Sequence, residues 1–214
     1  MTDCRWRYAG AVRYAEAMAM QKDLVRRRIA DEIPDTLVFV EHPHVITLGR
    51  LAKEAHLLQR RPEVEVVETD RGGDITYHGP GQIVGYPIVD LNLLRKDVKW
   101  YLERLEEVMI RTCERHGVVA NRAPGMTGAW VGERKIGAIG VRVERWVASH
   151  GFALNANTEL SYFDLIIPCG LEGKGVTSLA VETGRGADLD RLRRELAEDF
   201  GQVLGRRMIH GEGD

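Results

Sequence analysis

The sequence predicts an α+β protein in which a few helices pack on a mixed β-sheet. Apolar and β-branched runs of strand length recur along most of the chain, and three segments between them have helical periodicity. The 214 residues are 44% hydrophobic and 29% charged, which is an ordinary composition for a chain that buries a sizeable core. We expect one domain over residues 1–214, with a possible small C-terminal subdomain around the last helix.

The strand predictions rest on alternation and on β-branched composition. In CRWRY, Cys4, Trp6 and Tyr8 lie on one side and the two arginines on the other, which indicates a half-buried strand. The predicted strands are 4–8, 36–42, 45–49, 64–70 and 83–91, followed by a β-rich region from residue 127.

Three helices are predicted between these strands. The first covers 11–33 and ends before Pro34. The second covers 98–117, carries an apolar stripe that includes Leu105 and Met109, and is followed by a terminating glycine. The third covers about 188–205.

Charge and composition exclude several classes of protein. The formal net charge is -2 and no basic patch stands out, so we expect no nucleic-acid partner. No apolar run is long enough to span a bilayer, and the first ten residues, MTDCRWRYAG, lack an apolar secretory segment. We therefore expect a cytoplasmic protein without a membrane partner. Three cysteines give no disulfide framework.

The three cysteines differ in their surroundings. Cys113 follows the apolar stripe of its helix and Cys4 alternates with Trp6, so both are predicted to be core residues. Cys169 lies between proline and glycine in IIPCGLEGKGVTSL, where residues interrupt regular structure. It is either a reactive residue or a loop cysteine that packs under its own turn.

A nucleophilic cysteine needs a lowered pKa, which a nearby cation supplies. The candidate cations are Lys174, Lys135, His78 and His150. Lys135 is unusual because GERKIGAIG embeds it in an apolar, glycine-rich strand, although an edge-strand lysine would have the same surroundings.

Glycine-rich stretches suggest close approach of a ligand to the backbone. RGGDITYHGPGQ (71–82) matches no phosphate-binding motif, and GLEGKGVT (170–177) lacks the spacing of a P-loop. These glycines fit either a thin ligand lying between strand ends or ordinary hairpins and bulges. No histidine or cysteine cluster has metal-ligand spacing, and no G-x-S-x-G elbow is present.

Three blocks taken together resemble the lipoyl(octanoyl) transferases. They are RGGDITYHGPGQIVGYPI, KIGAIGVRVERWVASHGFALNAN and IIPCGLEGKGVTSL, and the similarity extends in order from about residue 36 to residue 180. The resemblance implies the fold shared with biotin and lipoate protein ligases, a mixed sheet with packed helices. The chain departs from the family at Asp74, where glutamine is common, and at Ala156, where a larger residue often occurs.

The resemblance also implies a site. Cys169 corresponds to the nucleophile that carries the acyl group as a thioester, and Lys135 to its partner, which lowers the cysteine pKa and transfers protons. The implied substrate-binding residues are Arg71, Gly72, Gly73, Asp74, Ile75, Thr76, Tyr77, His78, Ala138, Ile139, Gly140, Gly151, Phe152 and Ala153.

The implied reaction moves octanoyl from octanoyl-acyl carrier protein to a lysine of lipoyl domains, with neither ATP nor a metal. The implied acceptors are lipoyl domains of 2-oxoacid dehydrogenase acyltransferase subunits and the glycine cleavage H protein. Three alternatives stay open: an ATP-dependent lipoate or biotin ligase, a non-catalytic protein that binds acyl carrier protein or lipoyl domains, and a thioesterase that uses Cys169 with water.

Overall fold

The structure is a computed structural model that describes residues 2–168 and 173–211. Its helices are α1 (Tyr14–Ile29), α2 (Val98–Arg115), α3 (Leu179–Thr183) and α4 (Leu189–Leu204), with 3-10 turns η1 (Glu54–His56), η2 (Leu91–Leu93) and η3 (Leu160–Leu165). The main sheet contains β1 (Thr2–Ala11), β2 (Asp35–Glu41), β6 (Gln82–Asp90), β7 (Asn121–Ala123), β8 (Met126–Val131), β9 (Arg134–Glu144), β10 (Val147–Asn155), β11 (Gly175–Val176) and β12 (Arg206–His210). A second sheet contains β3 (Val45–Leu48), β4 (Glu65–Glu68) and β5 (Ile75–His78).

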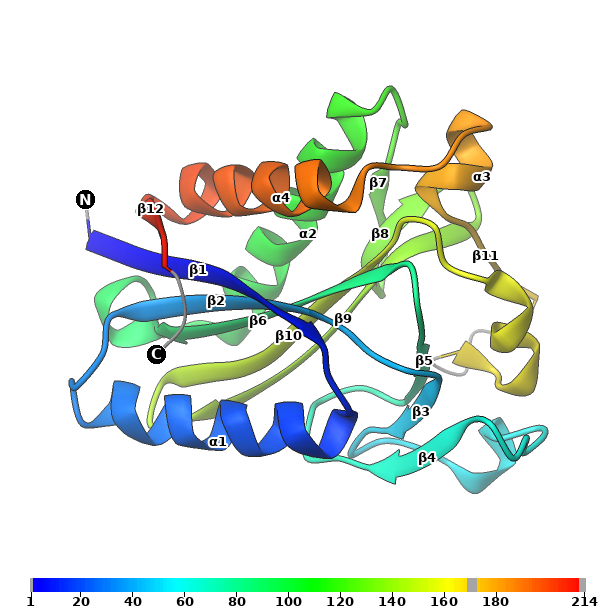
Figure 1. The fold of residues 1–214 in the computed structure, drawn as a ribbon, viewed down its shortest axis with the longest axis horizontal. Coiled ribbons are helices and arrows are strands. Elements are labelled where there is room, and N and C mark those ends of the chain that lie inside the picture. Colours follow the sequence, from blue (N-terminus) through cyan, green and yellow to red (C-terminus); the bar gives the residue numbers. More distant parts are fainter. Residues whose placement is uncertain (1, 169–172, 212–214) are drawn as a thin grey trace.

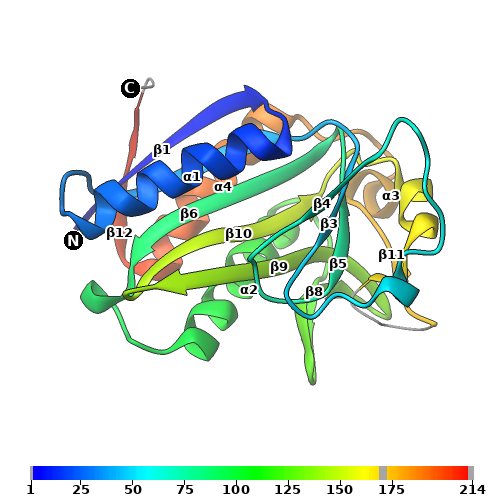
Figure 2. The same ribbon diagram turned by 90° about the horizontal axis from the view of Figure 1, so that it is seen from below.

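The main sheet is mixed and has helices on both faces (Figure 1). Its strand order is β12-β1-β2-β6-β10-β9-β8-β7, and β11 pairs with β9. α1 covers one face, whereas α2 and α4 cover the other. The second sheet, in the order β4-β3-β5, lies at one end of α1 (Figure 2). This architecture confirms the predicted α+β class. No helix within the described ranges is long and apolar enough to span a membrane.

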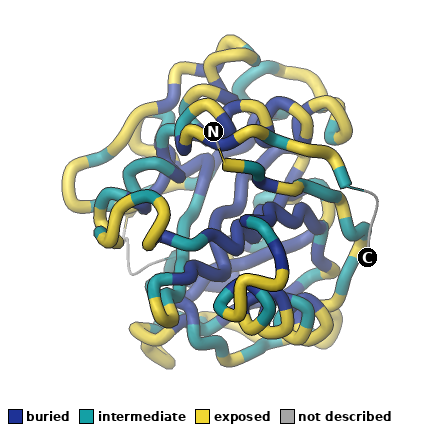
Figure 3. The backbone as a smooth tube through the Cα atoms, turned by 90° about the vertical axis from the view of Figure 1, so that its left-hand side faces the viewer, coloured by how far each residue is buried: buried dark blue, intermediate teal, exposed yellow. Residues whose placement is uncertain are grey.

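Burial on both faces explains the continuous apolar run of β2. Leu37 and Phe39 belong to the hydrophobic cluster beneath α2 and α4, whereas Val38 and Val40 belong to the cluster beneath α1. Alternate side chains of a strand point to opposite faces, so a central strand covered on both sides must be apolar throughout. The buried strands run through the centre of the molecule in Figure 3, with exposed segments around them.

The C-terminal elements form part of these layers. α4 packs on α2, and β12 pairs with β1 in parallel. Asp199 of α4 is buried and accepts hydrogen bonds from Thr112 Oγ1 at 2.8 Å and from Arg115 Nη2 at 2.7 Å, both on α2.

A buried carboxylate joins the ends of three elements. Asp35 has a fully buried side chain and accepts a hydrogen bond from Arg28 Nε of α1 at 3.0 Å and from Arg206 Nε of β12 at 2.9 Å. It also accepts the backbone N–H of Asp90 at 3.0 Å. Arg28, itself almost fully buried, therefore fixes α1 to the sheet, although the arginine lies in a helix of weak sequence amphipathy.

Asp35→Ala is expected to lower the free energy of unfolding by about 3–5 kcal/mol, because it leaves two buried guanidinium groups without their shared carboxylate. Asp31 is the matched control: it also pairs with Arg28, at 2.7 Å, but its side chain is 89% exposed. Asp31→Asn, which removes the charge and keeps a residue type suited to the left-handed backbone at φ 59°, should cost less than about 1 kcal/mol. Urea unfolding of both variants measures the difference, and equal losses would contradict this account of Asp35.

Candidate active site

A narrow cavity lies on the sheet where α1, β5, β6, β9 and β10 meet. Its lining residues come from those elements and from the loop before β5: Tyr14, Arg71, Gly73, Thr76, His78, Val84, Tyr86, Ala138, Ile139, Gly140, His150, Gly151, Phe152 and Ala153. Two of the three sequence blocks, 71–88 and 135–157, therefore meet in this cavity, together with Tyr14 of α1. Most of the predicted substrate-binding residues are among them.

The remaining predicted residues lie elsewhere. Gly72 and Asp74 line a wider groove of ≈ 800 Å³ that also contains Lys135 and runs between the loop at Leu51 and the start of α2 at Val98. Ile75 and Tyr77 alternate with Thr76 and His78 along β5. Their side chains therefore point away from the narrow cavity and pack in the hydrophobic cluster that includes Phe163 and Leu165.

Close backbone approach shapes the floor of the narrow cavity. Gly151 pairs with Gly140 across β10 and β9. A Cβ at Gly151 would lie 2.2 Å from the carbonyl oxygen of Gly85, and a Cβ at Gly85 would lie 2.5 Å from Cζ of Phe152. Neither position can carry a side chain without displacing its neighbour. These contacts are within the protein, so close approach of a ligand to these glycines stays a prediction.

Arg71 holds one wall of the cavity. Its guanidinium donates to Thr47 of β3, at 2.8 Å to both the carbonyl oxygen and Oγ1, and it is buried. The next residue, Gly72, donates its N–H to the carbonyl of Val141 in β9 at 2.8 Å. The loop is thus fixed between the second sheet and β9.

A chain of amide hydrogen bonds determines the tautomer of His78. Asn155 Nδ2 donates to the Thr177 carbonyl at 2.9 Å, which leaves Asn155 Oδ1 to accept from Gln82 Nε2 at 2.9 Å. Gln82 Oε1 must then accept from His78 Nδ1–H at 2.7 Å. The Nε2 atom of His78 is therefore the unprotonated nitrogen.

Burial keeps this histidine neutral. It lowers the pKa of His78 to about 3, with the nearby His42 as a second cause. Burial also lowers the pKa of His42 to about 4. His42 bonds the Tyr86 hydroxyl through Nε2 at 2.7 Å, just beneath the narrow cavity. His78 was a candidate cation, and the structure instead places a neutral imidazole there at neutral pH.

Lys135 lies at the N-terminal end of β9, before the part of the strand that lines the narrow cavity, and β8 and β11 flank it. It is only 7% exposed, and its ammonium lies 4.8 Å from the centre of the Trp130 ring. Within the described ranges, no carboxylate forms an ion pair with it. A cation held on an aromatic face in apolar surroundings is available to a negatively charged reacting group.

A small cavity at Lys135 adjoins the narrow cavity. Its lining includes Lys135, Phe163, Pro168 and Val176, and it shares Thr76, Ala138 and Ala153 with the narrow cavity. Pro168 immediately precedes Cys169 in the sequence. Cys169 itself lies outside the described residues, as do residues 170–172. Lys135 is therefore placed beside the segment that leads to Cys169.

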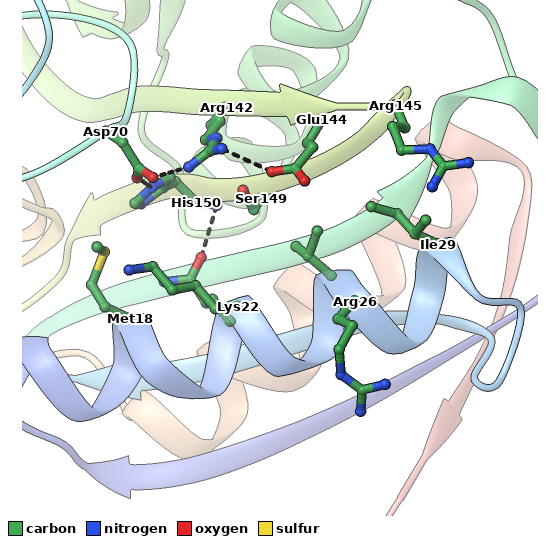
Figure 4. Close-up of a pocket in the computed structure, with 12 residues that line it drawn as sticks. Met18, Lys22, Arg26, Ile29, Asp70, Arg142, Glu144, Arg145, Ser149 and His150 are labelled. Carbon is green, nitrogen blue, oxygen red and sulfur yellow. Dashed lines mark hydrogen bonds and ion pairs between the residues drawn. The ribbon is translucent and has the colours of Figure 1, made fainter.

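A fourth cavity, of ≈ 440 Å³, lies between α1 and the β9–β10 hairpin (Figure 4). Its wall on the side of the narrow cavity is His150, which lines both. His150 Nε2 bonds Asp70 Oδ1 at 2.7 Å, and its backbone N–H donates to Gln21 Oε1 at 2.8 Å. Burial lowers the pKa of His150, while Asp70 opposes that shift.

Lys174, Cys4 and Cys113 lie outside the cavities of the candidate site. Lys174 forms an ion pair with Glu133 at the surface. Cys4 and Cys113 are fully buried, which confirms both as core residues. Burial raises the pKa of Cys113 to about 12 and raises that of Cys4 as well.

Sequence reasoning missed several residues of the site. Tyr14, Gln82, Trp130 and Asn155 line the cavities or contact Lys135 and His78. Gln82 and Asn155 adjoin the glycine-rich and FALNAN segments, so buried polar residues within apolar strands were the available signal. Tyr14 and Trp130 gave no such signal.

Comparison with known proteins identifies relatives over nearly the whole chain. Residues 13–201 match the family described as the lipoyl protein ligase A/B catalytic domain. An octanoyltransferase of Rubrobacter xylanophilus is 50% identical over 206 residues, covering 93% of this chain and 92% of the relative. One of Solibacter usitatus is 46% identical over 216 residues, covering 99% and 97%.

The fold recurs in solved structures. A bipartite lipoate protein ligase from Thermoplasma acidophilum, described with its E2 lipoyl domain, gives a TM-score of 0.73 at 13% identity and covers 98% of this chain and 86% of that chain. The similarity shows a shared fold and confirms the lipoate-ligase-like architecture predicted from the resemblance.

The neutral state of His78 predicts acid sensitivity. The unfolded chain binds a proton at a histidine near pH 6.5, whereas folded His78 binds one only near its pKa of about 3. Stability therefore falls as the pH drops below about 6.5, by about 2 kcal/mol between pH 6.5 and 4.5 for this one group. His78→Asn should flatten the pH dependence of urea unfolding by that amount, and the exposed His210→Asn should not. Parallel curves for all three proteins would contradict a neutral His78.

Proposed function

We propose that this chain, which belongs to the lipoyl protein ligase A/B catalytic-domain family, carries the octanoyl group as a thioester on Cys169. Its activity is octanoyl transfer in protein lipoylation, an acyltransferase reaction. The observation that carries the proposal is Lys135, a buried cation in the cavity that also contains Pro168. This cavity shares Thr76, Ala138 and Ala153 with the narrow cavity, and the two together would hold an unbranched acyl chain.

In the first half-reaction, the Lys135 ammonium favours the Cys169 thiolate. The thiolate sulfur attacks the carbonyl carbon of the octanoyl thioester, and a tetrahedral intermediate forms. Its collapse breaks the bond to the donor sulfur. The donor leaves as a thiol after taking a proton from Lys135, and the octanoyl group stays on Cys169.

In the second half-reaction, a lysine of the acceptor attacks the same carbonyl carbon. An exposed lysine is protonated at neutral pH, so its amine must lose protons to become a nucleophile and then an amide. One proton goes to solvent before the attack, and neutral Lys135, which gave up its proton to the first leaving group, accepts the other. The C–S bond then breaks, which restores the thiolate and the ammonium.

The partners follow from this chemistry. The donor is octanoyl-acyl carrier protein, whose thioester is already activated, so the proposed reaction requires neither ATP nor a metal ion. The acceptors are lipoyl domains of 2-oxoacid dehydrogenase acyltransferase subunits and the glycine cleavage H protein. The related ligase described with an E2 lipoyl domain supports a lipoyl-domain acceptor.

The intermediate is tested by intact mass after incubation with octanoyl-acyl carrier protein in the absence of ATP and acceptor. We expect the mass of one octanoyl group to be added, the adduct to be released by hydroxylamine, and Cys169→Ala to gain nothing. Later addition of a lipoyl domain should remove the adduct and octanoylate that domain.

Other outcomes of this experiment select the alternatives. An unmodified protein that octanoylates the lipoyl domain only with ATP and free octanoate would be a ligase. An unmodified protein that is inactive under both conditions would be a binding protein. Release of free octanoate without an acceptor would indicate a thioesterase.

The position of the acyl chain predicts a change in chain-length preference. Ala138 lines both the narrow cavity and the one at Lys135, and it is half-buried. Ala138→Leu adds carbons that displace about three acyl methylenes, each contributing about 0.8 kcal/mol when buried. We expect kcat/KM for an octanoyl donor to fall about 50-fold. A butanoyl donor is the internal control and should change less than about threefold, whereas equal losses for both donors would place the chain elsewhere.

A further inference from the structure

A bulge places Lys135 opposite Trp130. In the ladder between β8 and β9, Ala129 lies opposite Gly137, but the next residue, Trp130, lies opposite Lys135. Ile136 is therefore an extra residue on β9. Without the bulge, Ile136 would lie opposite Trp130, and the side chain of Lys135 would point to the other face of the sheet. The bulge buries Ile136 in the core and directs Lys135 to the same side as the indole.

Trp130 is itself immobilised. Its side chain is 2% exposed, and Nε1–H donates to the carbonyl of Met126 at 3.1 Å. Its ring lies 4.8 Å from Lys135 Nζ. Among the described residues, no ion pair to Lys135 is present, and its ammonium contacts the Trp130 ring instead.

A buried carboxylate supports the same strand. Glu106 of α2 accepts the N–H of Gly128 at 2.9 Å through Oε1 and pairs with Arg122 at 3.1 Å through Oε2. A Cβ at Gly128 would lie 2.4 Å from the carbonyl oxygen of Gly137. β8 is thus fixed to α2 on one side and to β9 on the other, so the ring has a defined position under Lys135.

From this geometry we propose that Trp130 is a positioning residue, whose ring holds the Lys135 ammonium in place and thereby stabilises the thiolate of Cys169. The inference rests on the proposed role of Lys135. Trp130 contributes no atom to the reaction. A ring face stabilises a desolvated cation and has little effect on a neutral amine. Loss of the ring should therefore destabilise and displace the Lys135 ammonium, and the Cys169 thiolate should lose stabilisation with it.

The test measures the thiolate directly. Iodoacetamide alkylates a thiolate sulfur with release of iodide, and Cys4 and Cys113 are fully buried, so the alkylation rate against pH reports Cys169. We expect Trp130→Leu to move the midpoint of this profile up by about one pH unit. Trp130→Phe keeps an aromatic face and should move it about half as far. The half-buried Trp100→Leu on α2 is the matched control and should not move it.

A double-mutant cycle separates positioning from a general structural effect. Lys135→Met should move the alkylation midpoint upward by itself. In that background, Trp130→Leu should add less than about 0.2 pH unit, because the ring no longer has a cation to hold. The same shift in both backgrounds would overturn the inference, and so would an unchanged midpoint in Trp130→Leu.

Failure of the inference differs from failure of the proposed function. If Lys135→Met moves the midpoint and Trp130→Leu does not, only the role of Trp130 is wrong. If Lys135→Met leaves the midpoint unchanged, the proposed role of Lys135 is wrong and the inference is wrong with it. Thermal unfolding of each variant shows whether it folds, and Trp130→Phe in both Lys135 backgrounds completes the cycle if Trp130→Leu does not fold.

Discussion

The contact between the loop at Arg71 and bare backbone of β9 is the constraint on which the site depends. Gly72 donates its N–H to Val141, and a Cβ on Gly140 would lie 2.9 Å from the Gly72 carbonyl oxygen. β8 pairs with β9 only between Arg134 and Gly137, which leaves the rest of that edge open to the loop. The second sheet is thereby tied to the main sheet, and the narrow cavity lies where they meet.

Charge is distributed unevenly along this path. Lys135, at one end, is a buried cation on an aromatic face, and the acyl chain would extend from it toward two neutral histidines. The Arg71 guanidinium also lines the narrow cavity, but it donates its hydrogen bonds to Thr47. His78 and His42 lie at the deeper end, where burial holds both pKa values well below neutrality. A cation near the reacting carbonyl carbon and neutral rings near the hydrocarbon match the polarity of a thioester with an alkyl tail.

The sequence predicted the positions of helices and strands better than it predicted which of their side chains point into the core or the site. Long periodic segments such as α2 and the β-branched run of β6 were evident from the sequence. The short strand β5 was not recognised, so its alternation, which turns Ile75 and Tyr77 into the core, could not be used. No sequence pattern marked Arg28 as buried, because its partner Asp35 is joined to it only through the fold. The bulge that directs Lys135 toward Trp130 depends on the register between β8 and β9, which the sequence pattern does not show.

The most direct test of the account is a crystal structure of the protein after acylation by an octanoyl donor. The account predicts electron density for the acyl chain that starts at Cys169 beside Lys135 and lies over the paired residues Ala138 and Ala153, with its methyl end near Tyr14 and His78. A chain that lies instead in the open groove at Leu51 and Val98 would contradict it. In that case the glycine contacts that form the narrow cavity would serve the fold and not the substrate.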